Sequence, residues 1–390
     1  MISAVMPTYS RADLAFERGE GAYLYSTSGD KYLDFASGIA VTALGHSHPH
    51  LVETLITQGR KLWHTSNLFQ IPEQTRLAER LVATSFADTV FFGNSGAEAG
   101  ELAIKVTRKY QHETGHPERY RIIGCRGAFH GRTLATLAAA GNEKYLKGFD
   151  PVVEGFDQVA FDNLNELRDR IGPETAGILV EPVQGEGGVR PASAGYLAGL
   201  RAAADEFGLV LIFDEVQCGM GRTGKLWAHE WAGIVPDVMM VAKGLGGGFP
   251  VGAVLATEQV GRVMGPGAHG STFGGNTLAM AIGNAVLDVM LAPGFMANVD
   301  AQAKVLRAEL EVLAARHPQV LSGVRGAGLI LGLQCAVPNT ELVEALRQHR
   351  LLAVGAGDNV VRLVPPLIIG PREIDEACAA IDAACRTWAG

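Results

Sequence analysis

Five continuous apolar runs constrain the fold more than any other feature of this chain. These runs are TVFFG (89–93), RIIGC (121–125), AGILVEP (176–182), LVLIFDE (209–215) and DVMMVAK (237–243). Apolar residues at successive positions, rather than at alternate ones, are typical of strands that helices cover on both faces. Helical patterns at 75–85, 97–110 and 195–208 separate some of the runs. The order of these patterns predicts an α/β fold with a largely parallel sheet.

The pattern changes in the C-terminal part of the chain. Helical periodicity at 299–316, at 340–350 and from Pro371 onward surrounds an apolar run at 328–334, which predicts a smaller α+β domain. Residues 21–36 alternate around a Ser-Gly-Asp turn and predict two short strands. We therefore expect three units, which are an N-terminal hairpin segment at 1–45, a large domain at 46–290 and a small C-terminal domain at 291–390.

Composition excludes several classes of function. The net charge is −8 and no block of Lys or Arg occurs, which argues against nucleic acid or an anionic membrane as a partner. The N-terminus lacks the pattern of a signal peptide, and no apolar window is long enough to span a bilayer. The five cysteines are scattered and form no CxxC pair, which fits a reducing compartment and provides no zinc site. We therefore expect a cytoplasmic, soluble protein.

Polar or ionisable side chains follow all five predicted strands. GNSGAEA (93–99) follows the first strand, and RGAFHGRT (126–133) follows the second. Glu181, Asp214 and Lys243 stand at the ends of the other three. In open parallel sheets, ligands bind at the carboxyl ends of the strands. This regularity predicts one shared site at that edge of the sheet.

The residue types at these strand ends fit pyridoxal 5′-phosphate. GNSGAEA lies between a strand and a helix, where backbone N–H groups can bind a phosphate. Lys243 is the one charged residue in MVAKGLGGGFPVGA (240–253), and a lysine in a low-dielectric pocket becomes an amine nucleophile that can form a Schiff base. A buried Asp214 needs a cation, which a protonated pyridine nitrogen would provide. Phosphate, aldehyde and ring nitrogen on one small molecule describe this cofactor.

Each motif also has a simpler interpretation. A lone lysine usually extends its amine to the surface, and a glycine-rich turn needs no ligand. GNSGAEA imitates a GxSxG nucleophile elbow, but position 97 is alanine and no His/acid pair is evident. GLGGGF (244–249) departs from the GxGxxG spacing of dinucleotide-binding loops. His46, His48 and His50 have no acidic partner at metal-ligand spacing, so we expect a turn at a helix start there.

The chain resembles the class III (ω-amino acid) aminotransferases of fold type I, and among them the acetylornithine aminotransferases. The similarity runs nearly from end to end. Its motifs are DFASGIAVTALGHSHP (34–49), LWHTSN (62–67), GNSGAEA (93–99), AFHGRT (128–133), VEPVQGEGGV (180–189), FDEVQCGMGRTG (213–224), AKGLGGGFP (242–250), HGSTFGGN (269–276) and VVRLVPPLII (360–369). The resemblance implies a pyridoxal-phosphate transferase fold with a large domain and a smaller C-terminal domain.

The resemblance also implies roles for four residues around the cofactor ring. Lys243 would bind the cofactor as a Schiff base and then carry the proton that moves between substrate and cofactor. Asp214 would keep the pyridine nitrogen protonated, so that the ring can take up negative charge. Gln217 would lie near the phenolic oxygen of the ring, and Phe129 would stack on one of its faces.

Four further residues are implied to hold the phosphate. Ser95, Gly96 and Ala97 would surround it, and Thr272 would reach it from the partner subunit of a homodimer. Members of the family often have threonine where this chain has Ala97. Backbone donation survives this difference, but one hydroxyl contact is lost, so we expect slightly weaker retention of the cofactor.

Arginines are the natural residues for the carboxylates of the two substrates, because their donors match a carboxylate in two places. By resemblance, Arg132 would bind the α-carboxylate of N2-acetylornithine, helped by Ser271 of the partner subunit. Arg362 would bind the α-carboxylate of glutamate, and Glu186 would mask it when the amine donor is present. Ornithine aminotransferases tend to have a tyrosine in place of Ile39, and an apolar residue there disfavours the free α-amino group of ornithine.

These features predict a transaminase of arginine biosynthesis. It would convert N2-acetylornithine and 2-oxoglutarate into N-acetylglutamate 5-semialdehyde and glutamate. Succinylornithine, succinyl-diaminopimelate, ornithine and 4-aminobutyrate remain alternative donors. Two alternatives of another class are a non-catalytic relative that only binds the cofactor and a dinucleotide-dependent oxidoreductase. The presence of Lys243, Asp214, Arg132 and Glu186 together argues against the non-catalytic alternative.

Overall fold

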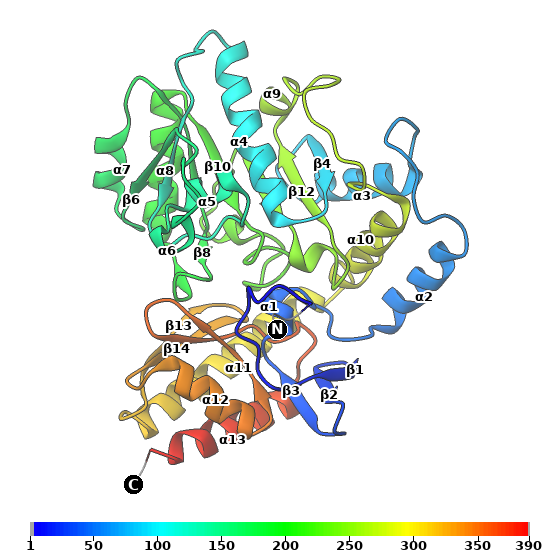
Figure 1. The fold of residues 1–390 in the computed structure, drawn as a ribbon, viewed down its shortest axis with the longest axis vertical. Helices are drawn as coiled ribbons and strands as arrows, with labels where there is room; N and C mark the ends of the chain where they lie inside the picture. The colour runs from blue at the N-terminus through cyan, green and yellow to red at the C-terminus, as the bar shows by residue number, and fades with distance from the viewer. Residues whose placement is uncertain (1–3, 389–390) are drawn as a thin grey trace.

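A seven-stranded mixed sheet forms the core of the larger, upper part of the computed structural model, which describes residues 4–388 (Figure 1). In spatial order its strands are β4 (Thr89–Gly93), β12 (Gly252–Ala256), β11 (Val238–Val241), β10 (Val210–Asp214), β7 (Thr175–Val180), β5 (Arg121–Cys125) and β6 (Phe156–Val159). The neighbours from β11 to β6 run parallel, while β12 is antiparallel to both β11 and β4. The prediction of an α/β fold with a mostly parallel sheet is therefore confirmed.

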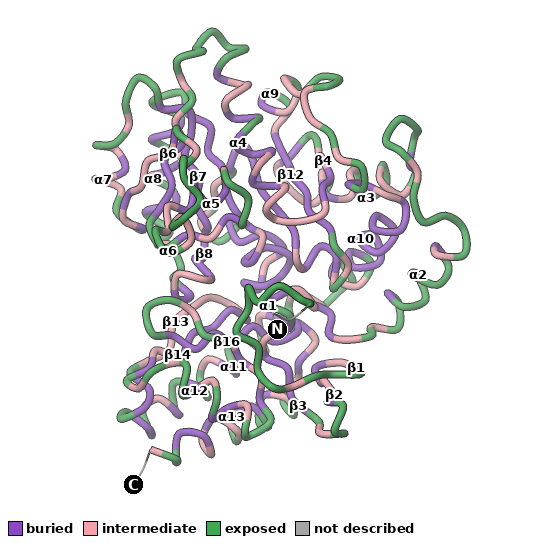
Figure 2. Tube along the Cα trace, in the orientation of Figure 1, coloured by how far each residue is buried: buried purple, intermediate pink, exposed green. Residues whose placement is uncertain are grey.

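The five apolar runs all become strands of this sheet, because β5, β7, β10 and β11 are buried on both faces and β4, at the edge of the sheet, is partly buried. Neighbouring residues such as Ile122 and Ile123 belong to two different core clusters, one on each side of the sheet. Leu211 and Ile212 likewise belong to different core clusters on opposite sides of the sheet. The strands lie among the buried segments in Figure 2. The sequence pattern did not predict β6 or β12, since FDQV and GAVLA are short and carry polar or small residues.

Helices cover both faces of the sheet. On one face, α4 (Gly96–Glu113) packs against β11 and β12, and on the other α8 (Ala194–Phe207) packs against β10 and β7. The helices α2 (Pro49–Gly59) and α3 (Pro72–Ala83) both contact α10 (Thr277–Met290). Nearly every residue of α10 is buried. A helix that is buried all round has no amphipathic period, which is why the sequence did not predict it.

The C-terminal part of the chain forms a second, antiparallel sheet. In spatial order it consists of β13 (Leu321–Ala327), β14 (Ile330–Cys335), β17 (Val360–Leu363) and β16 (Val354–Ala356). Three helices accompany it, which are α11 (Phe295–Arg316), α12 (Asn339–Gln348) and α13 (Pro371–Arg386). This arrangement agrees with the predicted α+β character of the C-terminal part.

The N-terminal strands lie beside this C-terminal part (Figure 1). A third sheet contains β1 (Phe16–Glu20), β2 (Tyr23–Ser26), β3 (Lys31–Asp34) and β15 (Leu351–Leu352). The predicted two-strand hairpin corresponds to β2 and β3, and β3 pairs in parallel with β15. The domain limits at 45/46 and 290/291 stay predictions, and the outermost residues of the two terminal units, 1–3 and 389–390, lie outside the described residues.

Shorter elements connect these parts. They are α1 (Ser37–Ala40), α5 (Leu134–Ala140), α6 (Glu143–Leu146), α7 (Leu164–Arg170), α9 (Glu258–Gly261), β8 (Val183–Gln184), β9 (Arg190–Pro191) and the two 3₁₀ turns Ala228–Trp231 and Lys243–Leu245. Between residues 4 and 388, no single helix has the length and apolar composition needed to cross a membrane. The pair α10 and α11 meets both criteria together, but the two helices are bent by 71° at their break.

Candidate active site

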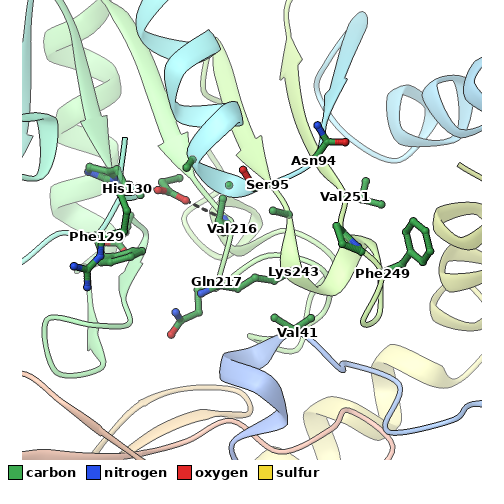
Figure 3. Close-up of a pocket in the computed structure, with 18 of the residues that line it drawn as sticks. Val41, Asn94, Ser95, Phe129, His130, Val216, Gln217, Lys243, Phe249 and Val251 are labelled. Carbon is green, nitrogen blue, oxygen red and sulfur yellow. Dashed lines mark hydrogen bonds and ion pairs between the residues drawn. The ribbon is translucent and has the colours of Figure 1, made fainter. Parts of the chain in front are cut away.

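A cavity of about 410 Å³ lies at the carboxyl edge of the parallel strands (Figure 3). Its walls come from the loops after β4 and β5, the ends of β7, β10 and β11, the loop before β12, and Val41 near the N-terminal strands. All five predicted strand ends therefore contribute to one site, as their positions in a parallel sheet require. A concave site of this size is typical of those that bind small molecules.

Asp214, at the end of β10, is buried and held at both of its oxygens. Oδ1 accepts a hydrogen bond from the backbone N–H of Val216 at 3.0 Å, and Oδ2 lies 2.8 Å from Nδ1 of His130. Burial alone would lower the pKa of His130, but the hydrogen bond and charge of Asp214 outweigh it and raise that pKa. Among the described residues, Nε2 of His130 has no hydrogen-bond partner. The pair fixes the orientation of a carboxylate inside the cavity.

Glu181, at the end of β7, is a second buried carboxylate of the cavity. Its Oε2 accepts a hydrogen bond from the backbone N–H of Phe129 at 3.1 Å. Burial raises the pKa of Glu181, and the nearby charge of Asp214 acts in the same direction. Glu215, the neighbour of Asp214 in sequence, does not line the cavity. It accepts hydrogen bonds from the backbone N–H groups of Ala228 and His229.

Lys243 reaches the same cavity from the end of β11 (Figure 3). Burial of its amine lowers its pKa to about 8, and the positive charge of Arg362 acts in the same direction. Its backbone has a φ of +45°, a left-handed conformation that is uncommon outside glycine. The interpretation of Lys243 as a surface lysine is therefore wrong for this structure, and the amine is available as a nucleophile near neutral pH.

The loop between β4 and α4 forms another wall of the cavity, which Asn94, Ser95, Gly96 and Ala97 line. Ser95 is the N-cap of α4, and its hydroxyl accepts a hydrogen bond from the backbone N–H of Glu98 at 3.2 Å. A Cβ atom on Gly96 would lie 2.8 Å from a methyl group of Val216, so this position leaves no room for a side chain. The first turn of an 18-residue helix thus opens toward the cavity, as in helix-terminal phosphate sites.

Arg362 lies on β17, far from the other groups in sequence, and is only 1% exposed. Its Nη1 donates to Oε1 of Glu186 and to Oε1 of Gln217, both at 2.7 Å. Burial works against ionisation of Glu186, but the charge and hydrogen bond of Arg362 outweigh it and lower its pKa. Arg362 is therefore not a surface residue of its strand, and Gln217 connects this ion pair to the cavity wall.

The remaining residues predicted to bind substrate or phosphate are Arg132, Ser271 and Thr272, and only Arg132 lines the cavity of its own chain. Arg132 lines the cavity and is exposed. Ser271 and Thr272 do not line the cavity of their own chain. Ser271 instead borders a second cavity of about 590 Å³, and its hydroxyl accepts a hydrogen bond from Asn94 Nδ2 at 3.3 Å. Ile39 does not line the cavity either, although Val41, two residues further along the chain, does.

Several cavity residues were not singled out from the sequence. They are Val41, Asn94, His130, Gly131, Val216 and Phe249. His130 could have been found, since it stands in the AFHGRT segment that follows a strand end. The partner of this histidine is 84 residues away in sequence, so nothing local in the sequence indicates their contact.

The remaining sequence motifs have structural explanations. His48 is the N-cap of α2 and Pro49 its first residue, which confirms the predicted helix start. His46 Nε2 lies 2.7 Å from Asp34 Oδ2, and His50 Nε2 lies 3.0 Å from Asp288 Oδ2. Within the described part of the chain, no group of three His, Cys, Asp or Glu side chains could hold a metal ion.

GLGGGF forms a tight turn that leads into a strand and not into a helix, so it is not a dinucleotide fingerprint.

Residues 5–385 match the family of class III aminotransferases. The chain belongs to this family. It is 61% identical over 377 residues to the acetylornithine aminotransferase of Brucella melitensis, which covers 97% of this chain and 94% of that protein. It is 58% identical over 384 residues to the acetylornithine aminotransferase of Mesorhizobium japonicum, covering 98% and 96% of the two chains. The family membership explains why the motifs occur in one order along the whole chain.

Solved structures of family members have the same fold. The N-acetylornithine aminotransferase of Stenotrophomonas maltophilia K279a has a TM-score of 0.86 and 38% sequence identity, over 98% of both chains. The ornithine aminotransferase of Toxoplasma gondii ME49 has a TM-score of 0.94 and 29% identity, over 98% of this chain and 93% of that one. The protein is thus an aminotransferase with pyridoxal 5′-phosphate as its cofactor.

The cavity fits this cofactor in three respects. Lys243 offers an amine whose pKa is lowered to about 8. The N-terminal turn of α4 offers backbone donors for a phosphate, where Ser95, Gly96 and Ala97 line the wall. Asp214 offers a buried carboxylate, held by His130 and the Val216 amide, that a protonated ring nitrogen would neutralise.

Proposed function

We propose that this enzyme transfers the terminal amino group of N2-acetylornithine to 2-oxoglutarate. The products are N-acetylglutamate 5-semialdehyde and glutamate, in arginine biosynthesis. The observation that carries this proposal is the identity of up to 61%, over 97% of the chain, with relatives named acetylornithine aminotransferases. The ion pair between Arg362 and Glu186 supports a pocket that accepts two different substrates in turn.

The cofactor residues would divide the chemistry among them. When bound, pyridoxal phosphate supplies a carbonyl carbon for the amino group and a ring that takes up negative charge. Lys243 would hold the cofactor through its Nζ and then accept and return the proton of the donor's reacting carbon with the same atom. Asp214 would pair with the ring nitrogen. Phe129 would pack against the ring, and Gln217 would lie near its phenolic oxygen.

The phosphate would be bound by the helix terminus. Ser95, Gly96 and Ala97 would donate hydrogen bonds from their backbone N–H groups, where the positive end of the α4 dipole favours an anion. Thr272 of the partner subunit would complete the contact with its hydroxyl.

The two arginines would distinguish the substrates. Arg132 would bind the α-carboxylate of acetylornithine, together with Ser271 of the partner subunit. Glu186 would neutralise Arg362 while the amine donor is bound, and Arg362 would be released to bind the α-carboxylate of glutamate in the second half of the cycle. An ion pair can act in this way because a carboxylate of the substrate competes for the same guanidinium donors.

A homodimer with shared active sites is part of this proposal. Two segments that pack together expose large apolar side chains. The exposed fraction is 88% for Leu68, 69% for Trp63 and 59% for Phe273. Asn67 joins the segments, donating to the backbone oxygen of Ser271 at 3.2 Å. An exposed apolar surface of this kind is typical of an interface. A second subunit on it would explain how Ser271 and Thr272 serve a cavity that they do not line in their own chain.

We also propose that the enzyme works in the cytoplasm, since its five cysteines, Cys125, Cys218, Cys335, Cys378 and Cys385, are all free.

The donor is tested by comparing kcat/KM for acetylornithine, succinylornithine, ornithine and 4-aminobutyrate with 2-oxoglutarate as the acceptor. We expect acetylornithine to have the highest value. A higher value for ornithine or 4-aminobutyrate would refute this donor, and a protein with cofactor absorbance but no turnover on any donor would show a non-catalytic relative.

A further inference from the structure

The guanidinium of Arg132 is held at the cavity by aromatic rings. Its Cζ atom lies 3.7 Å from the centroid of the Tyr145 ring and 5.3 Å from the centroid of the Phe129 ring. Within residues 4–388, we find no carboxylate or carbonyl oxygen that accepts a hydrogen bond from it. Arg362 is the opposite case, since its Nη1 is bonded to both Glu186 and Gln217. The two arginines of the site are thus held by different kinds of contact.

Local structure explains how Tyr145 reaches Arg132. Arg132 lies in the loop before α5 (Leu134–Ala140), and Tyr145 lies on α6 (Glu143–Leu146), which packs against α5. Gly141 ends α5 in a left-handed conformation with a φ of +63°. Asn142 then caps α6 by accepting a hydrogen bond from the backbone N–H of Lys144 at 3.1 Å. The chain therefore turns back on itself, and the half-buried ring of Tyr145 comes to lie against Arg132.

The type of contact decides what Arg132 can still bind. A ring attracts a guanidinium through its π-face and uses none of the N–H donors, which point outward in the plane of the group. A carboxylate neighbour would occupy those donors and compete with the substrate. Without the ring, a long exposed arginine would also lose more conformational entropy on binding. Tyr145 can thus restrain Arg132 while all of its donors stay available.

We propose that Tyr145 is a positioning residue, which holds the guanidinium of Arg132 in place for the α-carboxylate of the amine donor. This inference rests on the proposed function, in which Arg132 binds that carboxylate. Tyr145 itself acts through Arg132 and takes no part in the proton transfers. The ring carries the effect, so phenylalanine can replace tyrosine at this position and an aliphatic or amide side chain cannot.

The test compares two donors that differ only in the α-carboxylate, N2-acetylornithine and N-acetylputrescine. The donor half-reaction is followed without 2-oxoglutarate, by the loss of the cofactor's visible absorbance at a series of donor concentrations. For Tyr145→Leu we expect the half-saturating concentration of acetylornithine to rise about three- to tenfold, with the limiting rate unchanged, because one cation–π contact is lost. The rate with N-acetylputrescine should not change. Tyr145→Phe should behave as the wild type with both donors.

Two controls separate positioning from general damage. Tyr25→Leu removes the ring from a comparable stack in β2, where Arg18 Cζ lies 3.5 Å from the ring centroid, and it should leave both donors unaffected. In an Arg132→Ala background, Tyr145→Leu should have no further effect, since a residue that acts through Arg132 needs Arg132. Melting temperatures show whether each variant is folded, and Tyr145→Gln takes the place of the leucine variant if that variant fails to fold.

The outcomes distinguish this inference from the proposed function. Equal losses with both donors, or an additional loss in the Arg132→Ala background, would overturn the positioning role of Tyr145. An unchanged half-saturating concentration in Tyr145→Leu, with a large increase in Arg132→Ala, would also overturn it and leave the function of Arg132 intact. If Arg132→Ala itself binds acetylornithine normally, the proposed role of Arg132 is wrong, and the inference about Tyr145 is lost with it.

Discussion

At the scale of single residues, Lys243 combines an unusual backbone with an unusual side-chain environment. Its φ of +45° is a conformation that costs energy for a residue with a side chain, and such strain is concentrated at functional sites. Its amine is buried near a second cation, Arg362, and both effects favour the neutral form. Burial and the charge of Arg362 thus favour the neutral amine of Lys243, which is the form that can react with a carbonyl group.

The pKa of Lys243 predicts the pH dependence of its reactivity in the protein freed of cofactor. The neutral amine is the reactive form, so the rate at which an amine-specific reagent modifies Lys243 should rise with pH to a plateau, with a midpoint near pH 8. The lysine amine of a model peptide in water has its midpoint at about pH 10.4. Peptide mass spectrometry after brief labelling measures the midpoint of Lys243. A midpoint as high as that of the model peptide would contradict the burial argument.

Glu186 is the residue whose charge should decide between the two substrates. Glu186→Gln removes the negative charge 2.7 Å from Arg362 and leaves the guanidinium uncompensated. We expect the ratio of kcat/KM for glutamate to kcat/KM for acetylornithine to rise about threefold to tenfold, as for other charge-assisted contacts. Separate measurements of the two half-reactions give the ratio. A ratio that falls or stays constant would show that Glu186 does not mask Arg362.

At the scale of elements, the N-terminus of α4 carries Ala97 at the position where the resemblance to the family leads us to expect a threonine. Ala97 is in the first turn of this helix, and its side chain lines the cavity but has no hydroxyl. Ala97→Thr should add one hydrogen bond from the new hydroxyl to the phosphate and lower the dissociation constant of the cofactor about threefold to tenfold. Equilibrium dialysis or fluorescence titration of the cofactor-free protein measures this constant. If the threonine variant binds the cofactor no more tightly, the missing hydroxyl has no effect on retention.

The packing of α4 also fixes the phosphate-binding residues relative to Lys243. The N-cap of this helix, Ser95, lies two residues after the end of β4, and its apolar face packs against β11, which ends two residues before Lys243. The phosphate cradle and the lysine are therefore joined through one packed core cluster. A close-packed interior holds such groups at a fixed separation, because side chains there have little free volume in which to shift.

At the scale of the whole molecule, the proposed homodimer with shared active sites predicts complementation between inactive variants. Lys243→Ala removes the amine from its own cavity, and Thr272→Arg should block the cavity of the partner. Mixed dimers of these two variants contain one site with neither change. Refolding or exchanging an equal mixture should then restore about a quarter of wild-type activity, since half of the dimers are mixed and each has one intact site. No recovery despite proven subunit exchange would contradict shared sites, and native mass spectrometry, which separates mixed from parent dimers by mass, measures the exchange.

The sequence alone predicted much of the large sheet, because double-sided burial leaves a continuous apolar run that is easy to recognise. TVFFG and RIIGC match β4 and β5 residue for residue. It also predicted that Asp214 and Lys243 lie at one edge, since the carboxyl ends of parallel strands must meet there. The buried helix α10 and the short strand β12 were missed, because their burial depends on neighbours that the local pattern does not contain.

Contacts between distant parts of the chain were decided only by the tertiary structure. Arg362 contacts Glu186, which is 176 residues away, because β17 of the C-terminal sheet brings it beside the turn between β8 and β9. The resemblance implied a function for both residues, but their burial and their 2.7 Å contact could not be read from spacing. The contacts of His130 with Asp214 and of Tyr145 with Arg132 likewise could not be read from spacing, and neither His130 nor Tyr145 had a role predicted from the sequence. Periodicity and strand ends are local properties that a sequence records, whereas the partner of a charged group is set by packing across the whole fold.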